Sequence, residues 1–181
     1  LIVMDDANLD LAVKAAVLSV YKTTHQRCVS ADILIPHKKI ASTFTKQFID
    51  MTKRVRFGDP LDETVFAGPL INQQAVVKYN SFAAKARAEC DEPLLLGHAQ
   101  NRSNFVTPNV FLMKYRHAAF VLREEAFTPN VVIVPVDGFD EAMSVANDHE
   151  YGLAMSLITE DFRKMREFKL RGKAGLKYVN L

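Results

Sequence analysis

Cys28 is the residue of this sequence whose type and position are best suited to chemistry. It lies in Thr23-Thr24-His25-Gln26-Arg27-Cys28-Val29-Ser30, between an amphipathic helix-like run over 8–22 and an apolar strand-like run over 32–36. A thiol at such a junction can be presented at a backbone edge, where Arg27 and free backbone N–H groups of a turn favour the nucleophilic thiolate. The alternative reading is a small packing residue under the strand, because free cysteine is among the most often buried residue types.

Strand-like and helix-like runs alternate along the chain and would have to position this thiol. Apolar runs typical of strands cover residues 1–4, 32–36, 94–96, 105–106, 110–113, 131–136, 153–159 and 176–179, and residues 117–122 look extended. Helical spacing of apolar residues covers 8–22, 39–51, 72–86, 139–147 and 161–170. Asn8 and Asn72 are candidate N-caps, and the segment 58–71, which contains glycines and prolines, reads as a surface loop. The alternation predicts an α/β fold, layered, with a largely parallel sheet and flanking helices.

The composition is that of a soluble globular domain. The 181 residues fit one domain with a real core, and the hydrophobic fraction of 49% and charged fraction of 24% are ordinary. A formal net charge of +2 argues against a nucleic-acid partner. No apolar run approaches the roughly 18–20 residues that span a bilayer, so we expect no membrane partner. Two cysteines and five histidines show no metal-ligand spacing, so we expect no metal and a reducing, cytoplasmic setting.

Both ends of the chain are strand-like by pattern. The chain starts at Leu1 within an apolar run, without a methionine, and stops at Tyr178-Val179-Asn180-Leu181. Because the termini of complete domains are usually polar and loosely held, we expect a fragment of a longer polypeptide.

Several segments, in order, resemble one family. Gln26-Arg27-Cys28 is similar to the G-Q-x-C nucleophile motif of the NAD(P)-dependent aldehyde dehydrogenase superfamily. Further segments resemble that family at similar intervals: residues 2–10, Phe57-Gly58-Asp59-Pro60-Leu61, Gly68-Pro69-Leu70-Ile71, Glu124-Glu125-Ala126-Phe127-Thr128-Pro129, Tyr151-Gly152-Leu153 and Gly175-Leu176-Lys177-Tyr178-Val179-Asn180. The resemblance covers nearly the whole chain and implies a single Rossmann-related catalytic domain over residues 1–181, without identifying a subfamily.

The resemblance implies a chemistry that these residue types can perform. Cys28 would attack the aldehyde carbon as a thiolate, hydride would pass to NAD or NADP, and water would hydrolyse the resulting thioester. The backbone N–H of Cys28 would stabilise the developing oxyanion. Glu125 would accept hydrogen bonds from the nicotinamide ribose, and Phe127 would pack beside the nicotinamide. Read locally, Glu124 and Glu125 are instead a solvated charge pair and Phe127 a core ring.

The same resemblance implies a role at the active site for three further residues. Asn180 and Gln26 correspond to the substrate side of the site, although a turn residue at a strand end explains Asn180 equally well. Lys78 lies where some members of the family contact the cofactor ribose, while a lysine on a helix surface is the other reading.

The sequence departs from the family pattern close to these residues. His25 stands where a glycine usually precedes the nucleophile motif, and an imidazole there either influences the thiol or fills space. Thr128 and Asn130 stand where the family usually has glycine and valine, so a β-branched Thr128 could shift the loop that presents Phe127. Cys90 matches no family role, and we expect an ordinary thiol at a helix end.

Other parts of the family's site would lie outside residues 1–181. The general-base glutamate, the second oxyanion donor and the nucleotide-binding elements would lie upstream, the tail that completes the subunit interface would lie downstream, and no glycine-rich phosphate loop is present. We therefore expect the isolated chain to bind NAD(P) poorly and not to turn over. The full-length protein would be a homodimer or homotetramer that oxidises a small-molecule aldehyde to a carboxylic acid. Two alternatives stay open: a CoA-acylating semialdehyde dehydrogenase, and a non-catalytic scaffold that keeps only the fold.

Overall fold

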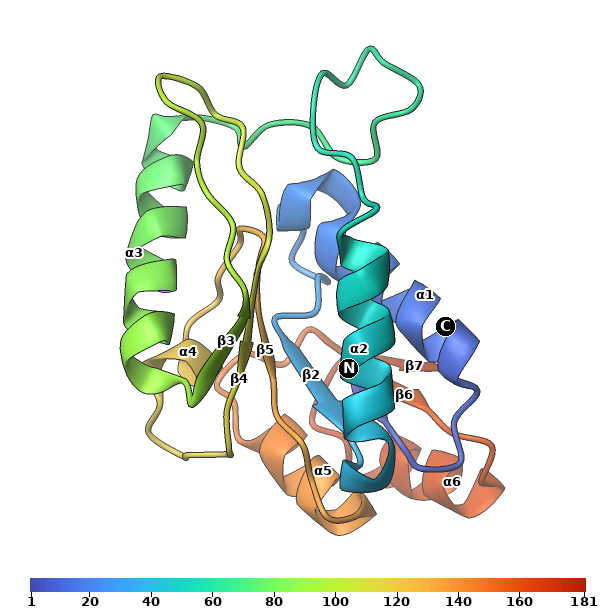
Figure 1. Cartoon of the computed structure of the whole chain (residues 1–181). Coiled ribbons are helices and arrows are strands. Elements are labelled where there is room, and N and C mark those ends of the chain that lie inside the picture. The colour runs from blue at the N-terminus through green and yellow to red at the C-terminus, as the bar shows by residue number, and fades with distance from the viewer.

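Seven strands form one sheet in the order β3-β4-β5-β2-β1-β6-β7 in the computed structural model, which describes residues 1–181 (Figure 1). The strands are β1 Ile2–Val3, β2 Ile33–Pro36, β3 Glu92–Leu95, β4 Asn109–Leu112, β5 Asn130–Ile133, β6 Ala154–Ile158 and β7 Leu176–Val179. Every neighbouring pair is parallel except β3 and β4, which are antiparallel. The predicted layered α/β fold with a largely parallel sheet is confirmed.

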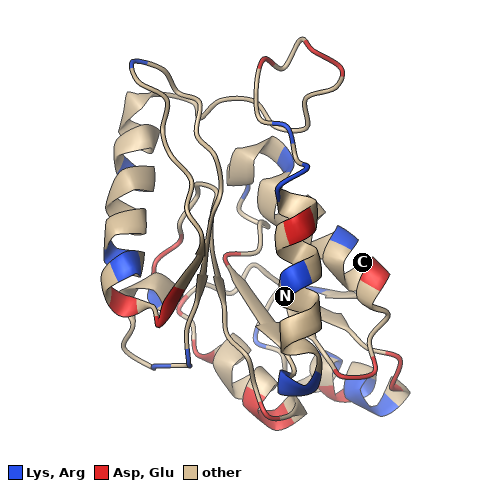
Figure 2. Cartoon of the chain, viewed as in Figure 1, with Lys and Arg blue, Asp and Glu red and all other residues tan.

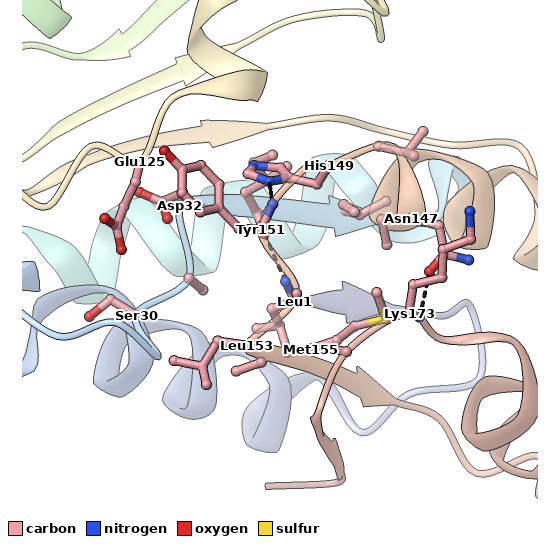
Figure 3. A pocket seen from close by; sticks show the side chains of 18 of the residues that line it. Leu1, Ser30, Asp32, Glu125, Asn147, His149, Tyr151, Leu153, Met155 and Lys173 are labelled. Carbon is pink, nitrogen blue, oxygen red and sulfur yellow. Dashed lines mark hydrogen bonds between the residues drawn. The ribbon is translucent and has the colours of Figure 1, made fainter.

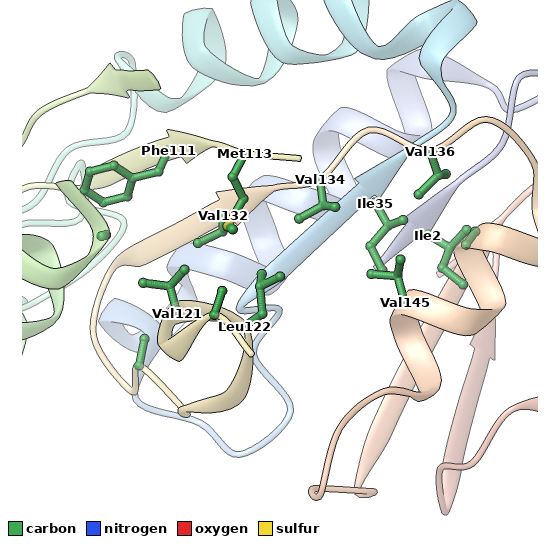
Figure 4. Packing of buried hydrophobic residues seen from close by; sticks show 14 of the residues in the cluster. Ile2, Ile35, Phe111, Met113, Val121, Leu122, Val132, Val134, Val136 and Val145 are labelled. Carbon is green, nitrogen blue, oxygen red and sulfur yellow. The ribbon is translucent and has the colours of Figure 1, made fainter. Parts of the chain in front are cut away.

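Helices cover both faces of this sheet. They are α1 Leu9–Tyr21, α2 Lys38–Thr52, α3 Gln73–Glu89, α4 Phe120–Arg123, α5 Phe139–Asn147 and α6 Phe162–Arg171, with a 3-10 turn, η1, over Lys22–His25. Successive strand residues point to opposite faces, so Val3 packs with α1 and α2, while Ile2 packs with the helices α3 to α6. Figure 4 shows the second of these cores, in which Ile2, Ile35 and Val132 meet Val121 and Val145. The strands are therefore buried on both sides, as parallel strands usually are.

Side-chain caps explain where four of the helices begin. Asn8 accepts a hydrogen bond from the Leu11 N–H at 3.1 Å, and Asn72 accepts one from the Ala75 N–H at 2.9 Å. These bonds satisfy N–H groups that have no partner within the helix. Both predicted N-caps are thus confirmed. Asp161 caps α6 by accepting the Arg163 N–H, and His37 caps α2 by accepting the Lys39 N–H.

Two local expectations are wrong. Residues 117–122, expected to be extended, contain the start of the one-turn helix α4. Val121 and Leu122 are both buried in the same core, which a strand could not achieve because its neighbouring side chains point to opposite faces. The expected strand at 105–106 is reduced to one antiparallel bridge between Ala99 and Val106.

The segment 58–71 contains no helix or strand, as predicted, and projects from the molecule beyond the end of α2 (Figure 1).

Positive and negative residues are mixed along the chain (Figure 2), with surface pairs such as Lys46–Asp50 at 2.7 Å and Lys39–Asp5 at 2.9 Å. None of the helices combines the length and the apolar character that crossing a membrane requires.

Candidate active site

A cavity of about 140 Å³ lies at the common amino end of the parallel strands β2, β1 and β6. Its wall contains Cys28, Asp32 and Glu125, together with His149 and Tyr151 from the segment after α5. In Figure 3, Glu125, Asp32, Tyr151 and His149 gather at one end of the cavity, and Lys173 lies at the other. The fold therefore brings a thiol, two carboxylates and an imidazole from distant parts of the sequence into one wall.

Cys28 is exposed in a turn between η1 and β2. The Ser30 N–H donates to the Arg27 carbonyl at 3.0 Å and closes this turn. Three consecutive residues before the turn have positive φ: Thr23 at 56°, Thr24 at 56° and His25 at 67°. This sharp change of direction ends the α1 path and leaves the thiol outside the core, so the alternative reading of Cys28 as a buried packing residue is wrong.

Arg27 does not extend towards the thiol. Its guanidinium donates to the carbonyls of Leu18 and Ser19, at 3.2 and 3.3 Å, in the last turn of α1. The Leu18 carbonyl also accepts the N–H of the C-cap residue Lys22, and a cation at the C-terminal end of a helix is favourable. The expected effect of Arg27 on Cys28 has no contact to support it.

His25 is buried and also faces away from solvent. Its Nδ1 lies 2.8 Å from the Val20 carbonyl, and its Nε2 lies 3.1 Å from Asp32 Oδ1. The imidazole is thus held within the turn that carries Cys28, in contact with a carboxylate of the cavity wall.

The cofactor-side residues predicted from the sequence are partly brought together. Glu125 is half-buried in the cavity wall, and its carboxylate makes no hydrogen bond within the chain. Phe127 is half-buried with a φ of 51°, and it is not among the lining residues. Thr128 and Asn130 are fully buried, and the Asn130 amide donates to Thr128 Oγ1 at 2.9 Å. The departures from the family pattern therefore form part of a polar cluster behind the Phe127 loop.

The three remaining predicted site residues do not line the cavity. The Gln26 side-chain amide donates to the Pro69 carbonyl and accepts the Ile71 N–H. The Asn180 side-chain amide accepts the Thr159 N–H at 3.0 Å and donates to the Thr159 carbonyl at 3.1 Å. Lys78 is exposed on α3. The assignments of Asn180, Gln26 and Lys78 stay predictions.

Sequence reasoning missed Asp32 and His149. Burial lowers the pKa of His149, which keeps this imidazole neutral at pH 7, and its Nδ1 accepts the Tyr151 N–H at 3.2 Å. A polar residue at the start of a strand next to the Cys28 segment was the available signal for Asp32. Nothing local marks His149, although Tyr151 belongs to one of the segments that resembled the family.

Cys90 is a different kind of thiol. It caps the C-terminal end of α3, and burial, followed by the neighbouring Glu89 charge, raises the pKa of Cys90 to about 12. The raised pKa favours the protonated thiol at neutral pH, and the place of Cys90 at the end of α3 is the one expected from the sequence.

Comparisons with known proteins agree on one family. The family model described as "Aldehyde dehydrogenase family" matches residues 1–181. Betaine aldehyde dehydrogenase of Brucella anthropi is 30% identical over 185 residues, which is 99% of this chain and 38% of that protein. Among solved structures, lactaldehyde dehydrogenase from Escherichia coli has a TM-score of 0.93 at 33% identity, covering 99% of this chain and 38% of that one. Betaine aldehyde dehydrogenase from Staphylococcus aureus, solved in complex with NAD+, has a TM-score of 0.93 at 27% identity, covering 99% of this chain and 36% of that one. This chain thus spans less than two fifths of the length of these relatives.

Proposed function

The chain belongs to the aldehyde dehydrogenase family, and from this premise we propose that residues 1–181 are the nucleophile-bearing domain of an enzyme that oxidises an aldehyde to a carboxylic acid with NAD or NADP. The observation that carries the proposal is that Cys28 and Glu125 line one cavity. An exposed thiol beside a carboxylate without a partner suits nucleophilic attack next to a hydroxyl-bearing ligand.

The residues present fit the nicotinamide end of such a cofactor. The Glu125 carboxylate accepts no hydrogen bond from the chain, so it is available to two vicinal ribose hydroxyls. Phe127 follows on the same loop, and its positive φ sets the direction of its side chain. A cavity of about 140 Å³ is smaller than the roughly 300–1,000 Å³ of ordinary ligand pockets, so residues outside this chain would hold the rest of the dinucleotide.

Cys28 performs the covalent step in this proposal. Its thiolate Sγ bonds to the aldehyde carbon, and the backbone N–H of Cys28 donates to the oxygen that becomes negative. Bound NAD(P) supplies the acceptor for the hydride that leaves this carbon. Loss of the hydride leaves a Cys28 thioester, and water cleaves it, which releases the carboxylic acid and regenerates the free thiol.

The alternatives have no observation in their favour. Exposure of Cys28 argues against a scaffold in which the cysteine only packs. We also propose that the full-length protein is cytoplasmic, in keeping with its two free thiols. We propose further that it is a homodimer or homotetramer and that the isolated chain binds NAD(P) weakly.

The test compares the two thiols in the full-length protein. Iodoacetamide should modify Cys28 much faster than Cys90 between pH 5 and 9, and NAD or NADP should change the Cys28 rate alone. Cys28→Ser should lower turnover of an aldehyde by about 10³-fold or more, while the control Cys90→Ser should retain it. Equal, slow modification of both cysteines, or full activity of Cys28→Ser, would overturn the proposal.

A further inference from the structure

We propose that Asp32 and His25 are positioning residues that hold the Cys28 turn and the Glu125 loop in a fixed relation. The inference rests on the proposed function, since it assigns Cys28 to the substrate and Glu125 to the cofactor. Its basis is one oxygen atom, Asp32 Oδ1, which lies 3.1 Å from His25 Nε2 and accepts the Ala126 N–H at 3.0 Å.

The first of these bonds closes the turn that carries the thiol. His25 precedes Cys28 by three positions and Asp32 follows it by four, so their side chains join the two ends of the turn. The imidazole is 1% exposed and the Asp32 side chain 24% exposed, which shields the bond from competing water. This contact therefore restricts the movement of the Cys28 turn relative to β2.

The hydrogen-bond partners of His25 and Asp32 fix the orientation of both side chains. The Val20 carbonyl, 2.8 Å from His25 Nδ1, can only accept, so Nδ1 carries a proton. On the other side of the ring, His25 Nε2 lies 3.1 Å from Asp32 Oδ1, so the imidazole links the Val20 carbonyl to this carboxylate. The same oxygen, Asp32 Oδ1, also accepts a hydrogen bond from the Ala126 N–H. A carboxylate acceptor makes a backbone N–H hydrogen bond stronger than a neutral acceptor does.

The second bond reaches the cofactor side. Ala126 is completely buried between Glu125, in the cavity wall, and Phe127, whose φ of 51° is unfavourable for a bulky residue. A backbone in this conformation persists only where its surroundings hold it. Figure 3 shows Asp32 and Glu125 at the same end of the cavity, so the bond to Ala126 acts directly beside the carboxylate that would bind ribose.

The backbone at His25 supports a specific role for the imidazole. Its φ of 67° is a left-handed conformation that glycine adopts without strain, and glycine is what the family resemblance led us to expect there. A side chain at this position costs stability unless its contacts offset the strain. The buried bonds to Val20 and Asp32 are contacts of that kind.

The full-length protein provides the test, with Asp32→Ala, Asp32→Asn and His25→Gly as variants. Asp32→Ala should raise KM for NAD(P) by about 10-fold or more and lower kcat, because a small misplacement at a reacting centre has large effects on rate. His25→Gly should shift both constants in the same direction although its backbone suits glycine. Asp32→Asn should recover most of the KM, because its amide oxygen still accepts the Ala126 N–H.

Two controls separate positioning from general loss of stability. Asp6 is another carboxylate that joins distant segments, accepting from Thr159 Oγ1 at 2.8 Å and the Glu160 N–H at 3.2 Å, outside the cavity wall. Asp6→Ala should lower the melting temperature without changing KM for the cofactor. Thr23→Gly relieves a φ of 56° at an exposed side chain and should leave both constants unchanged.

The outcomes distinguish this inference from the proposed function. If Cys28→Ser is inactive while Asp32→Ala and His25→Gly change KM no more than Asp6→Ala does, the positioning role is refuted and the nucleophile stands. If Cys28→Ser retains activity, the proposed function fails, and the positioning role fails with it. If Asp32→Ala does not fold, the KM values for NAD(P) of Asp32→Asn and His25→Gly are compared instead. A positioning role predicts a larger change of KM in His25→Gly than in Asp32→Asn, and equal values would refute it.

Discussion

Gln26 Oε1 accepts a hydrogen bond from the backbone N–H of Ile71 at 2.8 Å, and the same side chain donates through Nε2 to the Pro69 carbonyl at 3.3 Å. One amide thus joins the residue two positions before Cys28 to the end of the long surface loop. The two bonds hold the start of the Cys28 turn against the segment 58–71. A glutamine serves this purpose well because it offers both a donor and an acceptor.

Gln26→Ala should release this loop. The variant loses these two bonds and a third, from Nε2 to the Thr23 carbonyl at 3.2 Å. This loss is expected to lower the free energy of unfolding by about 1–2 kcal/mol and to speed hydrogen exchange at the Ile71 amide. Denaturant titration and amide exchange would measure both effects. Gln74→Ala, at an exposed position of α3 without a side-chain bond, is the matched control and should change neither. Unchanged exchange at Ile71 in Gln26→Ala would contradict the expectation.

Asn109 and Asn130 should prove strongly coupled. Both are buried, Asn109 Nδ2 donates to Asn130 Oδ1 at 2.8 Å, and Asn109 Oδ1 accepts the Gly97 N–H at 2.8 Å. Either single change to alanine leaves a buried amide without its partner and should cost about 1–3 kcal/mol. The double variant should cost less than the sum of the two, by about 0.5 kcal/mol or more.

Denaturant midpoints of the four proteins in this cycle give the coupling energy. Asn101→Ala, at an exposed turn, is the control for removing an asparagine and should lie within about 0.5 kcal/mol of the unchanged protein. Additive effects of Asn109→Ala and Asn130→Ala would show that the amide pair contributes nothing as a pair.

His149→Asn should remove a pH dependence of stability. Burial lowers the pKa of His149 in the folded chain, so below the ordinary value of about 6.5 the unfolded chain binds more protons than the folded one. Stability from this group is therefore complete above about pH 6.5 and is lost as the pH falls through that value towards the lowered pKa. Asparagine keeps an acceptor for the Tyr151 N–H two residues on, but it does not titrate.

The measurement is the difference in unfolding free energy between the unchanged protein and His149→Asn from pH 5 to pH 8. The unfolding free energy of the unchanged protein should fall more than that of His149→Asn as the pH is lowered. A difference that stays constant over this range would show that His149 is free to ionise in the folded chain.

Local pattern was sufficient for most of the elements. Asn8 and Asn72 cap helices where the sequence placed them, and the helix predicted over 139–147 has those bounds in the structure. Caps and the spacing of apolar side chains act within one or two turns of chain, so a single sequence contains them. The helix α4 was missed because one turn is too short for periodicity to be visible.

The sequence by itself determined the fold class, the family resemblance and the place of Cys28 between a helix and a strand. Only the tertiary structure decided which groups share a wall with that thiol. Arg27, its neighbour in sequence, turns to the end of α1, whereas Glu125 and His149 line the same cavity as Cys28. The reason is that this grouping depends on strand order: the sheet places β5, β2, β1 and β6 side by side, and the loops that precede β5, β2 and β6 converge only after the sheet is assembled.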